Sequence, residues 1–275
     1  MQIIETHIIE NGHNTSYITS LITALFYLPE HSTKLLHTIP QNKKFIFIQE
    51  FIKDRFIMNF KRGGCIYSHT INEFRNYLNI CGWRLTINEM INEHDIGEFY
   101  SYIINGIYGE SNLFFEKIND GIKEGEYKTN IIDLIINSED VNNISELFKS
   151  WINRNITMNK EYTYKMYNKS DILPIRIRRT NEKTKIDIMK YIKLFDCDNS
   201  NTNDFNIIWK IQSIICYNNN IGYYSIIFVS KTNEWIMISD KMIPSIKKIN
   251  MKYKKDVEDI SENAIILFYN CNKLN

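Results

Sequence analysis

At 275 residues, the chain is long enough to bury one sizeable hydrophobic core, and a single domain is the expected organisation. Its 33 basic and 32 acidic residues nearly cancel, which excludes a whole-chain electrostatic argument for binding nucleic acid or an anionic membrane. No apolar run approaches the roughly 20 residues that cross a bilayer, and the first ten residues lack the basic start of a signal peptide. We therefore expect an intracellular protein without nucleic-acid or membrane partners.

The first helix is predicted by apolar residues that recur at helical spacing from Tyr17 onward, and Pro29 marks its end. A polar turn containing Gly12 precedes it, so Ser16 stands where the helix begins. Free backbone N–H groups and the helix dipole favour an anion at such a position, which suits a nucleophile. The simpler interpretation is that Ser16 only caps the helix.

Further helices are expected in the first half of the chain. The segment that starts at Asp95 should form one of them, with Asp95 capping or charging its N-terminus and Phe99 facing the core. Several glycines between 106 and 125 favour a loop. The other expected elements are amphipathic helices at 43–61 and 71–80, a loop over 105–130, a β-rich run at 129–137 and a helix at 144–152.

The second half is predicted to be mostly β. Residues 173–179 alternate apolar and basic side chains, which is typical of an edge strand with solvated arginines. The lysine-rich run over 247–255 favours a solvated face. The remaining expectations are a hairpin at 160–169, strands at 186–195, 207–217, 222–230, 234–239 and 264–269, and a polar loop at 196–204.

The five cysteines include no C-x-x-C pair, and their number is odd. Neither a disulfide framework nor a zinc ribbon is therefore expected, and reduced, buried thiols fit an intracellular protein. We expect no metal site and no cofactor.

The turn and first helix resemble the nucleophile box of the ubiquitin-specific proteases, a family of papain-like deubiquitinases, which reads N-x-G-x-T-C-Y-x-N-S-x-x-Q-x-L. In that alignment Ser16 takes the place of the family's cysteine nucleophile. Asn11 takes the place of a residue that supplies an oxyanion-hole amide. The matching residues are Asn11, Thr15, Tyr17, Ser20, Leu21 and Leu25.

Five further stretches resemble family boxes, in the family order. Asp95, Glu98 and Phe99 match the box Q-x-D-A-x-E-F, in which Glu93 replaces the leading Gln. The helix at 144–152, the strand at 173–179 and the final strand at 264–269 also resemble family segments. Gly222, Tyr224, Trp235 and Asp240 match the remaining stretch, which carries the family's general base and, after a short turn, its orienting residue.

The resemblance also implies that the catalytic triad is substituted. Tyr223 stands at the position of the general-base His, Ser239 at that of the orienting Asp or Asn, and only the neighbouring Asp240 remains. A serine hydroxyl needs a base more than a thiol does, and a tyrosine with a pKa near ~10 is a poor base at pH 7. His13 is a candidate replacement base because it is close to Ser16 in sequence. We predict that the proton-transfer machinery has been lost.

The fold that the resemblance implies is a papain-like α+β domain over 1–275. A helical thumb at about 1–125 would pack on an antiparallel β palm at about 126–275. The fingers subdomain would be reduced or absent, because the two zinc-binding C-x-x-C pairs of many relatives are missing.

The first functional hypothesis is a catalytically inactive relative that binds ubiquitin, a ubiquitin-like protein or another protein partner, or that serves as a scaffold. An alternative is an active, divergent deubiquitinase that uses Ser16 with a non-family base. A third is an unrelated α+β binding protein with chance matches. The abundance of Ile and Asn indicates an A/T-rich genome, for which a large DNA virus is one source. Candidate residues of the cleft are Asp95, Glu98, Phe99, Gly222, Tyr224 and Trp235.

Overall fold

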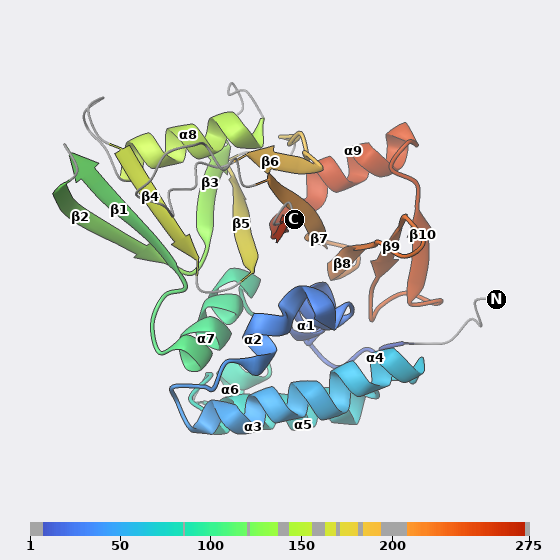
Figure 1. Ribbon diagram of the computed structural model, residues 1–275. Helices are drawn as coiled ribbons and strands as arrows, with labels where there is room; N and C mark the ends of the chain where they lie inside the picture. The colour runs from blue at the N-terminus through green and yellow to red at the C-terminus, as the bar shows by residue number, and fades with distance from the viewer. Residues whose placement is uncertain are drawn as a thin grey trace.

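The computed structural model describes residues 8–84, 86–119, 122–136, 143–155, 163–168, 171–180, 184–193 and 208–272. A layer of helices lies against one face of a β-sheet, and further helices lie on the opposite face (Figure 1). The loop expected at 196–204 lies outside the described residues.

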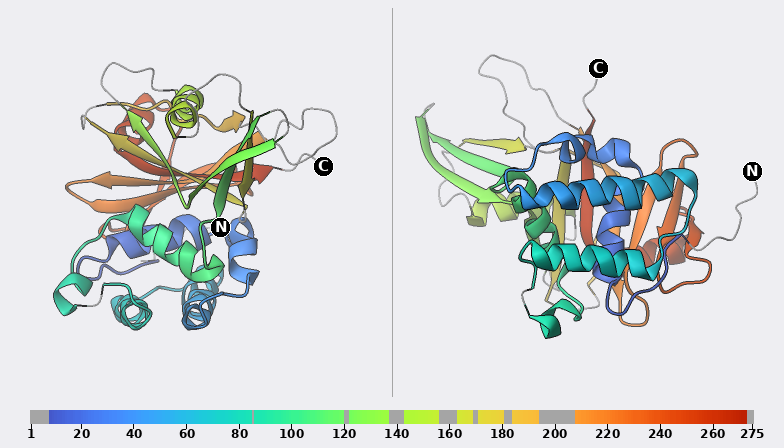
Figure 2. Two further views of the ribbon diagram at one scale, coloured as in Figure 1. Left: turned by 90° about the vertical axis from the view of Figure 1, so that its left-hand side faces the viewer. Right: turned by 90° about the horizontal axis from the view of Figure 1, so that it is seen from below.

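Helix α1 (Ser16–Phe26) lies at the centre of the fold, and all eleven of its residues are buried. It packs between the sheet and the remaining helices of its layer, of which α3 and α5 lie side by side (Figure 2). The other helical elements of this layer are η1 (Pro29–Ser32), α2 (Thr33–His37), α3 (Lys44–Phe51), the π-helical η2 (Ile52–Ile57), α4 (Met58–Arg62), α5 (Ser68–Ile80), α6 (Ile87–Met90) and α7 (Ile96–Tyr108).

Polar side chains on α1 form a seam against the sheet, where each finds a hydrogen-bond partner. Thr19 Oγ1 donates to Asp240 Oδ2 at 3.0 Å, and Thr23 Oγ1 lies 2.6 Å from Ser225 Oγ. On the sheet side, Ser213 Oγ donates to the Ala24 carbonyl at 2.7 Å. A helix without a solvent-exposed face can carry polar groups only when they are paired in this way.

The main sheet has the strand order β10-β9-β8-β7-β11-β5-β3, with β6 pairing to β7. Its pairs are antiparallel except for β3 with β5. Helices α8 (Ile144–Asn155) and α9 (Lys254–Asn263) lie on its outer face. The strands are β3 (Ile132–Ile136), β5 (Ile172–Arg179), β6 (Tyr191–Lys193), β7 (Ile208–Asn218), β8 (Gly222–Val229), β9 (Glu234–Ile238), β10 (Ile246–Ile249) and β11 (Ala264–Asn272).

The sheet is buried on both faces. Along β11, Ile266 and Phe268 belong to the core shared with α1 to α7, whereas Leu267 and Tyr269 belong to the core under α8 and α9. Because successive side chains of a strand point to opposite faces, such a strand reads as a continuous apolar run. This explains why the apolar runs of β7, β8, β9 and β11 were predicted from the sequence nearly to their ends.

The loop expected over 105–130 is not what the chain forms there. Helix α7 continues to Tyr108, and β1 (Leu113–Asn119) and β2 (Ile122–Thr129) then pair with each other. Gly106 lies inside this helix. A glycine is needed there because a Cβ at this position would clash with the ring of Phe45. The glycine signals a close approach of two helices here, and not a loop.

Strands β1 and β2 join β4 (Thr163–Asn168) in a separate sheet with the order β2-β1-β4. The prediction of a hairpin at 160–169 is therefore wrong, because β4 pairs with β1, which is distant in sequence. Within the described part of the segment expected as a strand or hairpin arm at 186–195, β6 covers Tyr191–Lys193.

Strand β5 was expected at a sheet edge with solvated arginines, but it lies between β11 and β3. Arg179 is half-buried and donates to three backbone carbonyls, those of Thr184, Ser261 and Ala264. The lysine-rich run, expected to form a solvated face, contains β10 and the start of α9. Lys247 and Lys248 are exposed on this edge strand, as is common at sheet edges.

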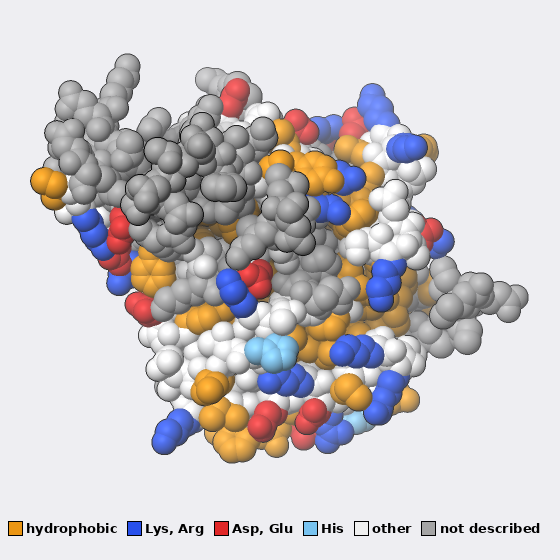
Figure 3. All heavy atoms as spheres, viewed as in Figure 1, with side chains coloured by type: hydrophobic (Ala, Val, Ile, Leu, Met, Phe, Trp, Pro, Cys, Tyr) orange, Lys and Arg blue, Asp and Glu red, His pale blue; other side chains and the backbone are white. Residues whose placement is uncertain are grey.

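Within the described ranges, no helix is long and apolar enough to cross a membrane. Among the same residues there is no cluster of three or more His, Cys, Asp or Glu side chains able to hold a metal ion. On the face seen in Figure 3, basic and acidic side chains are interspersed over the helical layer.

Gly106→Ala should destabilise the fold by about 1–3 kcal/mol, because the new methyl group overlaps the Phe45 ring. Urea unfolding measures this loss. Ser101→Ala, on the same helix at a half-buried position, is the matched control and should stay within about 0.5 kcal/mol of the natural protein. Equal stability of Gly106→Ala and the natural chain would contradict the close helix packing.

Candidate functional site

The residue expected to be the nucleophile, Ser16, is the first residue of α1 and has no exposed surface. The turn before it includes Asn14 with φ of 53°, and the Gly12 N–H donates to Thr15 Oγ1 at 3.1 Å. Thr15 occupies the N-cap position and makes no side-chain cap. The interpretation of Ser16 as a simple cap is therefore wrong, since its hydroxyl has other partners.

The Ser16 hydroxyl joins three parts of the chain. It donates to the carboxylate of Glu93, which lies in the segment between α6 and α7. It accepts a hydrogen bond of 3.3 Å from the backbone N–H of Tyr223, near the start of β8. The prediction that no proton acceptor remains beside Ser16 is thus wrong in one respect, because a carboxylate lies there.

Gly222 provides the space in which these groups meet. A Cβ at this residue would lie 2.9 Å from Lys241 Nζ, 3.0 Å from Ser16 Oγ and 3.5 Å from Glu93 Oε1. Its φ of 71° is also one that side chains other than glycine rarely adopt. A hydroxyl, a carboxylate and an ammonium group therefore converge on one backbone position.

The backbone N–H of Tyr223, the residue predicted at the general-base position, lies 3.3 Å from Ser16 Oγ. Its ring packs against Tyr217 with centroids 4.9 Å apart, and it is half-buried against the helical core. Burial, followed by the nearby carboxylates of Asp95 and Glu93, raises the pKa of the Tyr223 phenol. This group stays protonated at neutral pH and cannot accept a proton from Ser16.

Ser239 and Asp240 follow β9 and lie beside the first turn of α1. Ser239 Oγ accepts from the Lys241 N–H at 3.2 Å, while Asp240 Oδ2 accepts from Thr19. Burial raises the pKa of the Asp240 carboxyl to about 6, although the hydrogen bond from Thr19 opposes this. Asp240 Oδ1 is buried and makes no hydrogen bond within the described chain.

Asp95, from the second stretch that resembles a family box, contacts both the helical layer and the sheet. Asp95 caps α7, as predicted, by accepting from the Glu98 N–H at 2.9 Å, and it forms an ion pair with Arg176 of β5. Arg176 lies so close to Gly97 that a side chain there would collide with the guanidinium group. Glu98 is exposed and pairs with Arg84.

The remaining cleft candidates do not contact Ser16. Phe99 is fully buried, as predicted, and its ring centroid lies 5.1 Å from that of Tyr17. Tyr224 lies in the core on the outer side of the sheet and donates to Asp259 at 3.4 Å. Trp235 packs on Phe228.

Among the described residues, neither Asn11 nor His13 is shown hydrogen-bonded to Ser16, and their proposed roles stay predictions. Asn11 is exposed on the preceding turn, and His13 Nε2 lies 3.2 Å from the side-chain amide of Asn14. Sequence reasoning instead missed Glu93 and Lys241. The only sequence signal for Glu93 was that it replaces the leading Gln of a family box. No sequence pattern indicated that Lys241 would lie near Ser16.

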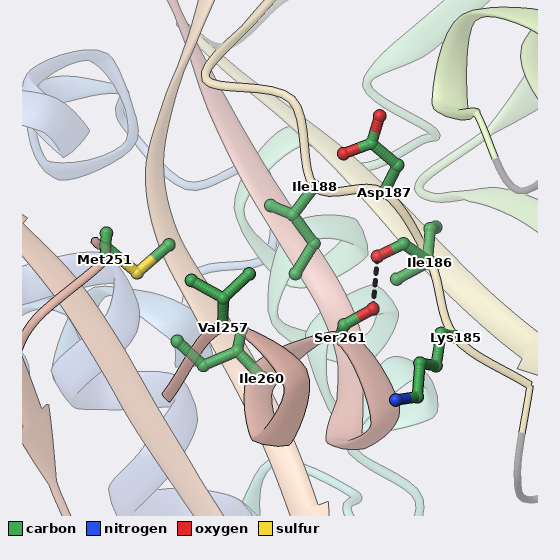
Figure 4. Close-up of a pocket in the computed structure, with 8 residues that line it drawn as sticks. All are labelled: Lys185, Ile186, Asp187, Ile188, Met251, Val257, Ile260 and Ser261. Carbon is green, nitrogen blue, oxygen red and sulfur yellow. Dashed lines mark hydrogen bonds between the residues drawn. The ribbon is translucent and has the colours of Figure 1, made fainter. Parts of the chain in front are cut away.

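A pocket of about 330 Å³ lies away from Ser16, between residues 184–190 and α9 (Figure 4). Its lining is mostly aliphatic, and Ser261 Oγ closes one end by donating to the Ile186 carbonyl at 2.6 Å. It shares no residue with the Ser16 site.

By sequence, neither a protein-family model nor a curated protein matches the chain. Its fold does resemble solved structures of the SAGA DUB module. The Ubp8–Sgf11–Sgf73–Sus1 module matches with a TM-score of 0.58 and 17% identity, covering 98% of this chain and 68% of that one. A second Ubp8/Sgf11/Sus1/Sgf73 structure matches with a TM-score of 0.60 and 13% identity, covering 98% and 69%.

A yeast module carrying a variant of Sgf73 matches with a TM-score of 0.57 and 14% identity, covering 98% of this chain and 67% of that one. At these identities the likeness shows the fold alone. The mixed α and β fold is like that of Ubp8, a ubiquitin-specific protease, as the sequence resemblance implied. The interpretation as an unrelated fold receives no support.

Asp240→Asn should change how stability depends on pH. The folded protein holds a proton on Asp240 up to a pKa of about 6, whereas the unfolded chain releases it near the ordinary value of 3.8. The contribution of this group to stability therefore falls as pH rises from about 4 to 6, by up to about 3 kcal/mol. The variant should lose this slope and gain about 1–3 kcal/mol at pH 7 in urea unfolding.

The exposed Asp187 offers a control, since Asp187→Asn should leave the slope unchanged. A lower stability of Asp240→Asn at pH 7 would show that the charged carboxylate is needed where it lies.

Proposed function

We propose that this chain is a ubiquitin-specific-protease-like protein that acts by binding a protein partner, or as a scaffold, and not by hydrolysis. The observation that carries the proposal is the state of the Ser16 hydroxyl. It has no exposed surface, its proton is donated to Glu93, and its oxygen accepts from the Tyr223 N–H. A nucleophile needs a path for the substrate, which the burial of Ser16 denies.

The chemistry of the neighbouring groups supports the same conclusion. A carboxylate is a weaker base than an imidazole, so it takes a proton from an alcohol less efficiently at neutral pH. Tyr223 replaces the imidazole with a group that is itself protonated. The Tyr223 N–H is also directed at Ser16 itself, and not at a position beside it where an oxyanion would form.

The proposed partner is ubiquitin, a ubiquitin-like protein or another protein. The similar solved structures are complexes of Ubp8 with Sgf11, Sgf73 and Sus1, which is consistent with a protein partner. We also propose the division into a thumb at about 1–125 and a palm at about 126–275 of one domain. The sheet β2-β1-β4 would then be the reduced fingers. An intracellular location, in the cytoplasm or nucleus, and a viral source belong to the same proposal.

The second candidate function is hydrolysis by Ser16 with Glu93 as a base outside the family pattern. The specific observation in its favour is the hydrogen bond from Ser16 to that carboxylate. It would require the cleft to open around Ser16, since a buried hydroxyl cannot reach a substrate.

A fluorogenic ubiquitin substrate and a suicide ubiquitin probe separate the two functions. The natural protein should show no turnover or labelling above the background of Ser16→Ala. Turnover that disappears in both Ser16→Ala and Glu93→Gln would establish the hydrolase instead. Circular dichroism of each variant checks that its fold is intact.

Titration of labelled ubiquitin onto the purified protein tests the binding role. Asn11→Trp places a bulky side chain at the exposed turn before Ser16 and should weaken saturable binding at least tenfold. Lys255→Trp, at an exposed position on α9, is the matched control and should leave binding unchanged. An absence of binding at high ubiquitin concentration would favour a scaffold or another partner.

A further inference from the structure

The pocket beside α9 is lined mostly by aliphatic side chains. Residues 185–188 form one wall, and α9 together with Met251 forms the other (Figure 4). Its volume of about 330 Å³ is at the lower end of the range for sites that hold small ligands. The aliphatic residues of the lining are Ile186, Ile188, Met251, Val257 and Ile260.

Contacts within the chain hold the two walls together without any ligand. The Ile186 N–H donates to the Ser261 carbonyl at 3.2 Å, and the Ser261 hydroxyl donates to the Ile186 carbonyl at 2.6 Å. Lys185 forms ion pairs with Glu258 and Glu262 of α9, at 3.4 Å and 3.1 Å. The space between the segment and the helix is therefore pre-formed, as in most sites for small molecules.

Part of the aliphatic lining is in contact with water. Val257 is 38% exposed although it is apolar, and Ile188 and Met251 are only partly buried. A chain of aliphatic carbon atoms placed against these side chains would remove their surface from water, which is favourable in proportion to the area covered. The lining therefore favours a ligand with an aliphatic body.

The charged side chains of the lining favour one sign of charge on the ligand. In Figure 4 the Asp187 carboxylate points away from the Lys185 ammonium group. Lys185 already has two carboxylate partners, whereas Asp187 is exposed and forms no ion pair within the part of the chain that the structure describes. The charge available to a ligand is therefore the carboxylate of Asp187, which favours a cationic group beside it.

We propose that this pocket binds a small primary aliphatic amine. Its carbon chain lies between Ile188 and Val257, and its ammonium group lies at the mouth of the pocket beside Asp187. A carboxylate with the same carbon chain binds less well, because Asp187 repels it and Lys185 is already neutralised. The pocket shares no residue with the Ser16 site, so this inference goes beyond the proposed function and is tested separately from it.

Three probes with the same carbon chain isolate the charge: n-hexylamine, n-hexanol and n-hexanoate. Titration into the full chain, followed by methyl NMR signals, should give saturable shifts at Ile188 and Val257 for the amine. The amine should bind about two- to fivefold more tightly than n-hexanol, as expected for a solvent-exposed ion pair, and n-hexanoate should bind more weakly than both. n-Propylamine, which buries less carbon, should bind about tenfold more weakly than n-hexylamine.

Two variants separate the role of charge from that of the apolar walls. Asp187→Asn should remove the preference for the amine over n-hexanol and leave the affinity for n-hexanol unchanged. Val257→Trp should fill the pocket and abolish the binding of all three probes. Lys255→Trp, at an exposed position of the same helix outside the pocket lining, is the matched control and should bind them like the natural protein.

The titrations of the natural protein keep the test valid if Val257→Trp fails to fold. The inference is overturned by an absence of saturable shifts with n-hexylamine, by equal affinity for n-hexanoate, or by a preference for the amine that survives Asp187→Asn. Nα-acetyl-lysine amide carries the ammonium group of a protein side chain and should bind more weakly than n-hexylamine. Tighter binding of this compound would overturn the assignment to a small free amine in favour of a lysine side chain.

Discussion

The complete burial of α1 is the constraint on which the rest of the structure depends. A helix with no face toward water must pair each of its polar side chains inside the protein, and the seam from Ser16 through Thr19 to Thr23 does this. Its partners come from the segment before α7, from the loop after β9 and from β8. The seam therefore fixes how the helical layer and the sheet meet.

The same seam accounts for the chemistry proposed for the cleft. In a working hydrolase the first residue of this helix would have to remain available to substrate, at some cost in hydrogen bonding. Here the buried hydroxyl of Ser16 donates to one partner and accepts from another, which stabilises the fold. Stability and catalysis make opposite demands on this one oxygen atom, and the hydrogen bonds favour stability.

Much of the fold could be predicted from the sequence because burial leaves a regular pattern. The helical period gave α1, α5 and the capping role of Asp95, and continuous apolar runs gave the strands from β7 onward. The failures have physical reasons. Gly106 marks a helix contact and not a turn. On β5, Arg176 pairs with Asp95 and Arg179 donates to backbone carbonyls, so neither arginine is simply solvated. The partner of Ser16 could not be predicted, since Glu93 is 77 residues away and its role depends on three-dimensional position.

Gly222 has a consequence for how this protein can change over generations. Both its backbone conformation and the crowding around its missing side chain exclude other residues. Ser16, Glu93 and Lys241 carry no such double restriction, so each can be exchanged for a residue of similar size. Natural variation can therefore alter the reactivity and charge of the cleft readily, while its geometry is inherited almost unchanged.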